Sequence, residues 1–222
     1  MLRTLLIVHL ALVASVHGAC QPQDTKAIRA CYKTFITAYG FDFAGENLPE
    51  YWDFHGKRDV WLANGLEVQP KIRDLGRVLR SCMDSYFDCV DKPDFIAMGQ
   101  NETDAANYMS DLAITGWQTS DRGHYLLLKH HYCLEHCGSH ASAELKACKT
   151  AYNNGKMSPE LPVKCKALSD YLVCNAGVIA DKCCGKEAAE FNCGSVRADE
   201  MISDEDFRHK CPSIAACPTG DQ

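Results

Sequence analysis

The sequence predicts an all-α protein, a disulfide-stapled bundle of about six to eight short helices. Three observations support this prediction. Apolar residues recur at steps of three and four along most of the chain, which is the helical period. Glycine, proline and asparagine turns separate these segments at short intervals. The chain has 14 cysteines, eight of them between Cys133 and Cys193, in segments that otherwise have the pattern of helices.

The N-terminus has the features of a secretory signal peptide, predicted at residues 1–18. Arg3 gives a positive start, residues 5–16 are almost wholly apolar, and small or neutral residues precede a cleavage point after Gly18. This apolar stretch is too short to cross a hydrocarbon core ~30 Å thick at ~1.5 Å per residue. A bacterial lipoprotein signal ending at Cys20 is the alternative, but it needs an aliphatic residue where His17 stands. The sequence therefore predicts a secreted, extracellular protein without membrane insertion.

The number of cysteines is even, and cysteines of secreted proteins are usually oxidised, so we expect seven disulfides and no free thiol. The predicted disulfide residues are Cys20, Cys31, Cys82, Cys89, Cys133, Cys137, Cys148, Cys165, Cys174, Cys183, Cys184, Cys193, Cys211 and Cys217. Short loops close at a lower entropic cost than long ones. We therefore expect the first four to pair among themselves and the other ten to do likewise.

This pairing corresponds to a division of the chain into four parts. They are a signal peptide at 1–18, an N-terminal helical half at 19–100, a C-terminal cysteine-rich helical half at 101–193 and a disulfide-pinned tail at 194–222. Because a chain of this length can form a core, the disulfides are expected to supplement burial rather than replace it.

Three helices are predicted in the N-terminal half, at residues 24–39, 50–63 and 70–92. The first has Asp24 as its expected N-cap and Gly40 as its C-terminal glycine. The third starts at Pro70 and ends before a second proline. Cys82 and Cys89 are seven residues apart, so we expect them on one face of this third helix.

Two surfaces of this half have alternative interpretations. The aromatic residues between Phe41 and Phe54 indicate core packing, with a ligand groove as the alternative. The third helix has a basic side, which indicates a solvated face, with a site for an acidic partner as the alternative. Its members are Lys71, Arg73, Arg77 and Arg80.

The sequon Asn101-Glu102-Thr103 lies in a polar stretch between predicted helices. In a eukaryotic secreted protein such a sequon is a glycosylation acceptor, so we predict that Asn101 is exposed and N-glycosylated. Thr103 is the expected N-cap of a helix at 104–115.

The C-terminal half and the tail are expected to contain helices at 121–137, 142–152, 162–174 and 199–210. Cys165, Cys174 and Cys183 are nine residues apart, which is two and a half helical turns. They are therefore expected to bridge to different neighbours, unless the helix breaks at Gly177 or Gly185.

The vicinal pair Cys183 and Cys184 is expected to have two separate partners, because the ring closed by a bond between them would be strained. Cys211 and Cys217 are expected to hold a tail that would otherwise fray.

The segment from His130 to His140 is the most suggestive of chemistry. Cys133 and Cys137 are four residues apart, as are His136 and His140, and this spacing can place two metal ligands on one helix face. Zinc binding is thus the alternative to disulfides here. Secretion favours oxidised cysteines, and Gly138 is expected to end the helix before His140. We therefore predict no metal site.

No catalytic or cofactor motif is present in the sequence. A nucleophile elbow, a phosphate-binding loop and a dinucleotide fingerprint are all missing, so we predict no catalytic residues and no cofactor. The net charge is −6, and no stripe of lysine and arginine interrupts the acidic residues. Nucleic acids and anionic membrane surfaces are therefore disfavoured as partners.

The Cys-x3-Cys element at Cys133 and Cys137, the spaced helical cysteines and the Cys183-Cys184 pair resemble the helix-rich, cysteine-rich secreted domains of invertebrates. These include domains of the nematode chondroitin-proteoglycan type. The resemblance covers residues 133–193 and implies an extracellular, non-catalytic role in matrix or host interaction. The chain lacks the Ser-Gly attachment runs of a proteoglycan, so the resemblance gives no support for glycosaminoglycan attachment.

We therefore expect a secreted, disulfide-rich, non-catalytic protein that binds an extracellular protein or glycan. Two alternatives stay open, a secreted hydrolase with an unrecognised site and a helical toxin or effector that acts on a receptor. A serine or aspartate beside a histidine in one shared pocket would favour the hydrolase.

Overall fold

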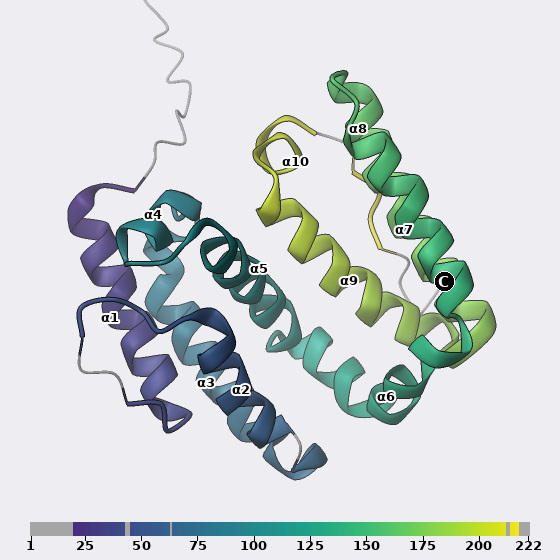
Figure 1. Cartoon of the computed structure of the whole chain (residues 1–222). Coiled ribbons are helices and arrows are strands. Elements are labelled where there is room, and N and C mark those ends of the chain that lie inside the picture. Colours follow the sequence, from purple (N-terminus) through teal and green to yellow (C-terminus); the bar gives the residue numbers. More distant parts are fainter. Residues whose placement is uncertain (1–19, 43–44, 63, 212–213, 218–222) are drawn as a thin grey trace, which may run out of the picture.

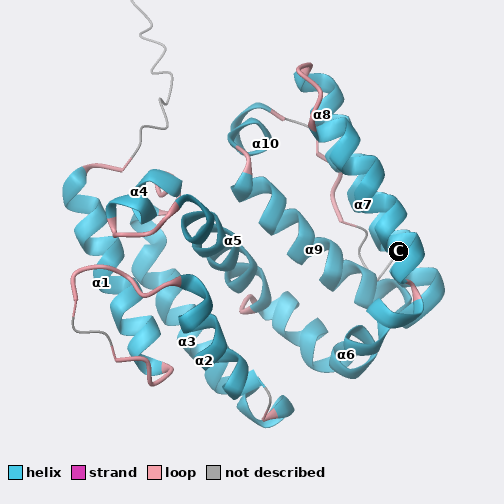
Figure 2. Cartoon of the chain, in the orientation of Figure 1, coloured by secondary structure: helices cyan, strands magenta, loops and turns pink. Residues whose placement is uncertain are grey.

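The computed structural model describes residues 20–42, 45–62, 64–211 and 214–217. The predicted signal peptide at 1–18 lies outside these residues. The described part of the chain is helical with no strand, as Figures 1 and 2 show. The predicted all-α, disulfide-stapled fold is confirmed.

The chain forms α1 (Pro22–Ala38), α2 (Tyr51–Leu62), η1 (Gly65–Val68), α3 (Gln69–Met83), η2 (Asp84–Tyr86), α4 (Lys92–Ala97), α5 (Glu102–Gln118), α6 (Asp121–His140), α7 (Ser142–Lys156), α8 (Leu161–Ile179), η3 (Ala180–Cys184), α9 (Gly185–Ser203) and α10 (Glu205–Lys210). The segments η1 and η2 are 3₁₀ helices, and η3 is a π-helix. None of the described helices combines the length and the apolar run that a membrane crossing requires.

The helices form two groups, which are visible in Figure 1. In the first group, α5 packs against α2, α3 and α4, and α1 packs against α3. In the second group, α8 lies between α7 and α9, and α6 contacts both α9 and η3. The contact between α5 and α9 joins the two groups. Below, the N-terminal half means α1 to α5, and the C-terminal half means α6 to α10.

Each group has its own buried core. The first core contains many aromatic rings, among them Tyr32, which meets Phe95 and Tyr108 edge to face at centroid distances of 5.3 and 5.6 Å. Tyr51 and Phe54 are buried in this core, so core packing is confirmed for these two members of the predicted aromatic cluster. Phe43 lies outside the described residues.

The seven disulfides are Cys20–Cys89, Cys31–Cys82, Cys133–Cys184, Cys137–Cys183, Cys148–Cys174, Cys165–Cys211 and Cys193–Cys217. The prediction that the cysteines pair within halves is confirmed. The vicinal cysteines have separate partners, as expected, and both partners lie on α6. The three cysteines spaced by nine residues also bridge to three different segments.

The prediction of one helix at 70–92 is wrong, because α3 ends at Met83. Asp84 and Ser85 follow, and short polar side chains of this kind compete with the helical backbone hydrogen bonds. The amides of Cys89 and Val90 both bond to the carbonyl of Tyr86, which turns the chain. Cys82 and Cys89 therefore do not share a helix face, although each bridges within its own half.

Two helix starts also differ from the prediction. The N-cap of α1 is Gln21, and Asp24 lies one turn in, where its carboxylate accepts a hydrogen bond from the Gln21 amide at 2.8 Å. The N-cap of α5 is Asn101 rather than Thr103, and its Oδ1 accepts from the amides of Thr103 and Asp104, each at 2.9 Å. Asn101 is exposed, as a glycosylation site requires.

The helices of the C-terminal half run further than predicted, and the expected end of the helix at Gly138 is wrong, because α6 continues to His140. α8 continues through Gly177, and the chain breaks at Gly185, whose positive φ of 77° favours glycine. α9 then runs unbroken past Cys193, so the expected boundary between 193 and 194 falls inside a helix. α7 runs through Gly155 to Lys156, and a Cβ at Gly155 would lie 2.5 Å from Cβ of Ala167, so this glycine lets α7 approach α8 closely.

Candidate functional site

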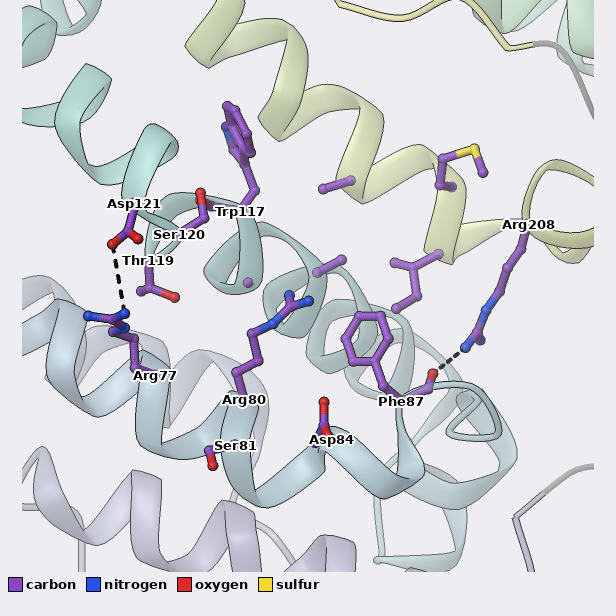
Figure 3. A pocket seen from close by; sticks show the side chains of 15 residues that line it. Arg77, Arg80, Ser81, Asp84, Phe87, Trp117, Thr119, Ser120, Asp121 and Arg208 are labelled. Carbon is purple, nitrogen blue, oxygen red and sulfur yellow. Dashed lines mark hydrogen bonds and ion pairs between the residues drawn. The ribbon is translucent and has the colours of Figure 1, made fainter.

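A broad cleft lies between the two halves, where α3, α5, α9 and α10 meet (Figure 3). Its volume is about 840 Å³. The lining residues come from both halves and are Arg77, Arg80, Ser81, Asp84, Phe87, Ala113, Gly116, Trp117, Thr119, Ser120, Asp121, Ala198, Met201, Ile202 and Arg208. Ligand sites are common at such junctions, and this volume lies within the ~300–1,000 Å³ range of small-molecule sites.

Arg80 extends from the last turn of α3 toward α5 in the middle of the cleft (Figure 3). Its guanidinium lies 5.3 Å from the ring centroid of Phe87, a cation–π distance. A Cβ at Gly116 would be 2.7 Å from Arg80 Nη1, so the absence of a side chain at Gly116 makes room for the guanidinium. No carboxylate in the described part of the chain lies within ion-pair distance of Arg80. This arginine can therefore bind an external anion without breaking an internal ion pair.

Arg77 lies one turn before Arg80 and borders the same cleft. It forms an ion pair with Asp121 at 3.7 Å, and Arg73 also pairs with Asp121. Asp121 is the first residue of α6, a position where a carboxylate is favoured by the helix dipole. Two arginines thus share one carboxylate at this end of the cleft, which leaves a local excess of positive charge.

Arg208 reaches the opposite end of the cleft from α10. Its Nη1 donates to the carbonyl of Val90 at 3.0 Å, and its Nη2 donates to the carbonyl of Phe87 at 2.5 Å (Figure 3). These carbonyls belong to the turn after α3. Arg208 therefore connects α10 to the N-terminal half by hydrogen bonds. No disulfide makes this connection.

The apolar part of the cleft is formed by Phe87, Trp117, Met201 and Ile202. Trp117 donates from Nε1 to the carbonyl of Phe191 at 2.9 Å. A Cβ at Gly194 would lie 2.3 Å from Cε2 of Trp117, so the indole packs directly on the α9 backbone. Ile202 on α9 is 8% exposed and belongs to the core of the N-terminal half. This apolar surface is thus built at the contact of α5 with α9.

The predicted basic side of residues 70–92 divides among several contacts. Lys71 lies over the Trp61 ring at 4.1 Å, and Arg73 and Arg77 pair with Asp121, so these three are engaged within the protein. Arg80 alone of the four lies in the cleft without a carboxylate partner among the described residues. Trp117 and Arg208 were not anticipated, because no local motif marks either residue.

The histidine-rich segment on α6 is used for disulfides and ion pairs. Cys133 and Cys137 are bonded to Cys184 and Cys183, so their sulfurs are not available as thiolate ligands. His130 Nε2 lies 3.2 Å from Glu187 Oε2. The side chain of His140 lies outside the described ones. Among described residues, one group has ligand atoms within 4.8 Å of one another, Cys20, Asp24 and Cys89, and its two sulfurs form a disulfide.

The described cleft lining brings positive charge and apolar surface together. It offers guanidinium groups, the Ser81 hydroxyl and an apolar surface, while the Ser120 hydroxyl is engaged as the N-cap of α6. Its carboxylates are Asp84 and Asp121, and its lining includes no histidine among the described residues. The hydroxyls and carboxylates are therefore not next to the usual general base of a hydrolase.

Comparisons with protein-family models, with characterised proteins and with solved structures find no match for this chain. The seven disulfides fit an extracellular, disulfide-rich protein.

Proposed function

We propose that the protein is a secreted, non-catalytic binding protein and that the cleft binds an amphiphilic ligand with an acidic head group. The observation that carries this proposal is the position of Arg80, which lies in the cleft without a carboxylate partner among the described residues. The apolar surface of Phe87, Met201 and Ile202 lies beside it. The head group would pair with Arg80, and the apolar part would cover this surface.

The charge distribution favours an anionic ligand at this place. The whole chain is acidic, with a net charge of −6. Arg77, Arg80 and Arg208 nevertheless gather around one concave surface, against Asp84 and Asp121. A concave surface with low-dielectric walls concentrates the field of such charges and raises the local concentration of a ligand of opposite sign.

The extracellular assignment rests on separate support. Seven disulfides and the predicted signal peptide both fit secretion. We also propose that Asn101 carries a glycan, since it is exposed at the start of α5. A relationship to invertebrate cysteine-rich domains of the chondroitin-proteoglycan type, suggested by cysteine spacing, would fit the same non-catalytic role.

The test is calorimetric titration of the oxidised protein with decanoate below its micelle concentration, with decyltrimethylammonium as the cationic comparison. We expect decanoate to bind and Arg80→Ala to weaken binding about tenfold, the loss of one charge-assisted hydrogen bond. Arg197→Ala is the matched control, because Arg197 is an exposed arginine of α9 outside the cleft lining. Equal binding of the cation, or equal effects of the two substitutions, would refute the proposal.

A further inference from the structure

A second, smaller cavity lies between the N-terminal half and α6. Its volume is about 250 Å³, and Thr119 is the only described residue that it shares with the cleft lining. The side chains that define its chemistry are Arg58 from α2, Gln69 and Arg73 from α3, Gln118 from α5, and His124 and His131 from α6. Four helices from distant parts of the chain therefore contribute hydrogen-bond donors to one cavity.

None of the described lining residues is an aspartate or a glutamate. The carboxylates that pair with the two arginines stand outside the lining. Arg58 pairs with Asp111 at 2.5 Å, and Arg73 pairs with Asp121. The cavity wall itself therefore presents positive and neutral donor groups, which favours an anion inside it.

Both arginines keep an unused donor. The Nε of Arg58 and the Nε of Arg73 are buried and have no hydrogen-bond partner in the described part of the chain. A buried donor left without a partner costs about 1–3 kcal/mol, and such groups are commonly satisfied by water or an ion. Both arginine side chains line this cavity, so an acceptor that enters it lies beside two guanidinium groups.

The remaining polar groups are also suited to donate. Burial raises the pKa of Tyr39, which lines the cavity, to about 12, so its hydroxyl keeps its proton. His124 is 6% exposed. Burial lowers the pKa of His124, and the positive charges of Arg73 and Arg77 lower it further, against the opposing effect of Asp74. An anion beside His124 would favour the protonated ring, which donates from both nitrogens.

We propose that this cavity is a binding site for a small oxyanion, a carboxylate, sulfate or phosphate, held by Arg58, Arg73 and His124. Guanidinium groups match the geometry of such ions through paired N–H donors. The cavity volume is several times the ~30 Å³ share of a water molecule, so a multi-atom ion fits. This site is separate from the cleft and needs no apolar ligand tail.

The experiment titrates the full-length oxidised protein with sodium sulfate, phosphate or acetate, against sodium chloride at equal ionic strength. The imidazole resonances of His124 and His131 report occupancy by NMR. We expect saturable shifts at both rings with at least one oxyanion, and the order of affinities identifies the preferred class. Shifts that stay linear with each oxyanion, or that chloride reproduces, would overturn the proposal.

Substitutions locate the site. Arg73→Gln is expected to weaken oxyanion binding at least tenfold, the loss of one charge-assisted hydrogen bond. Arg29→Gln is the matched control, since Arg29 also has a buried Nε without a partner but lies on α1 outside the described cavity lining. It should leave the affinity within about twofold. Equal weakening by the two substitutions would contradict the assignment.

Gln118→Glu provides a second test that does not remove an arginine. It keeps the size of the side chain and places a carboxylate on the cavity wall, so we expect it to abolish the saturable shifts. Sulfate also stabilises proteins generally by exclusion from their surface, and that effect would persist in this variant. Unchanged saturation in Gln118→Glu would refute the oxyanion site. The decanoate titration tests the cleft at Arg80 and does not depend on this result. Either proposal can therefore be refuted while the other stands.

Discussion

Two disulfides and a network of aromatic rings hold the N-terminal half, whereas five disulfides and fewer aromatic contacts hold the C-terminal half. The first core buries seven tyrosine and phenylalanine side chains, and the second buries three. An aromatic side chain buries about 150–250 Å². The half with less aromatic burial therefore has more covalent cross-links, which stabilise by restricting the unfolded chain.

The contact between the halves differs from both interiors. All fourteen cysteines lie in described residues, and none of their bonds crosses from one half to the other. The connection is made by Trp117 of α5, which donates to the carbonyl of Phe191 on α9, and by Arg208 of α10, which donates to the carbonyls of Phe87 and Val90. The proposed ligand cleft thus lies where no disulfide links the two halves.

Reduction of the disulfides is expected to have the largest effect on stability and to unfold the C-terminal half more than the N-terminal half. Each disulfide contributes about 2–4 kcal/mol, so five of them outweigh the marginal stability of a domain. We expect amide hydrogen exchange after reduction to show lost protection in residues 121–217 and partial protection in residues 22–118. Equal loss in both halves would show that the aromatic core does not replace cross-links.

Phe54→Ala tests the aromatic core with all disulfides intact. Phe54 is fully buried and meets Phe35, Tyr39 and Tyr108. Its removal leaves a cavity, so urea denaturation should show a loss of about 3–5 kcal/mol. The matched control is Trp52→Ala, two residues earlier and 62% exposed, with an expected change within about 0.5 kcal/mol. Similar losses for both would argue against the core as the source of stability.

Gly194→Ala tests the contact between the halves. The added methyl would meet the Trp117 indole, so we expect destabilisation of about 1–3 kcal/mol from overpacking and weaker decanoate binding in the cleft. Gly177→Ala is the matched helical control, because no atom lies within 4 Å of its added Cβ. That substitution should stabilise by about 0.5–1 kcal/mol. If both substitutions shift the denaturation midpoint in the same direction from that of the unsubstituted protein, the close contact between Gly194 and Trp117 would be contradicted.

Two tyrosine hydroxyls allow the same atom to be removed from each half. The Tyr32 hydroxyl is buried without a partner in the described residues, whereas the Tyr152 hydroxyl donates to Glu200 at 2.5 Å. Tyr32→Phe is expected to be neutral or stabilising by up to about 1 kcal/mol, and Tyr152→Phe to destabilise by about 1 kcal/mol or more. Equilibrium denaturation that gives both substitutions the same sign would refute this difference.

The smallest expected effect is on acid stability in the C-terminal half. Hydrogen bonds from Lys164 at 2.6 Å and Lys210 at 2.8 Å lower the pKa of Asp206 to about 2. The unfolded value is about 3.9. The folded pKa is the lower one, so this contribution is present above about pH 4 and is lost as the pH falls toward 2.

Asp206→Asn should therefore reduce the fall in melting temperature between about pH 4 and pH 2. Asp170→Asn is the control, because Asp170 pairs with Lys166 on an exposed helix face. If the melting temperature of Asp206→Asn depends on pH in the same way as that of the unsubstituted protein, Asp206 does not contribute to acid stability.

The helical class, the disulfide participation of the cysteines and their pairing within halves could be predicted from the sequence. Helical periodicity depends on neighbours a few residues away, and loop closure favours nearby partners. The terminators Gly40 and Gly185 were also predictable, because a positive φ is a local requirement that glycine meets. For the cleft, the sequence indicated the basic side that includes Arg77 and Arg80. It did not indicate the residues of α5, α9 and α10 that form the rest of the lining.

The passage of α9 beyond Cys193 and both cavities were decided by the tertiary structure. Arg80 needs the space beside Gly116, Trp117 needs the bare backbone of α9, and Arg208 needs two carbonyls over a hundred residues earlier in the chain. None of these requirements is visible in a local window of sequence. They arise because side chains distant in sequence share one volume, and packing at crystal-like density determines which of them fit.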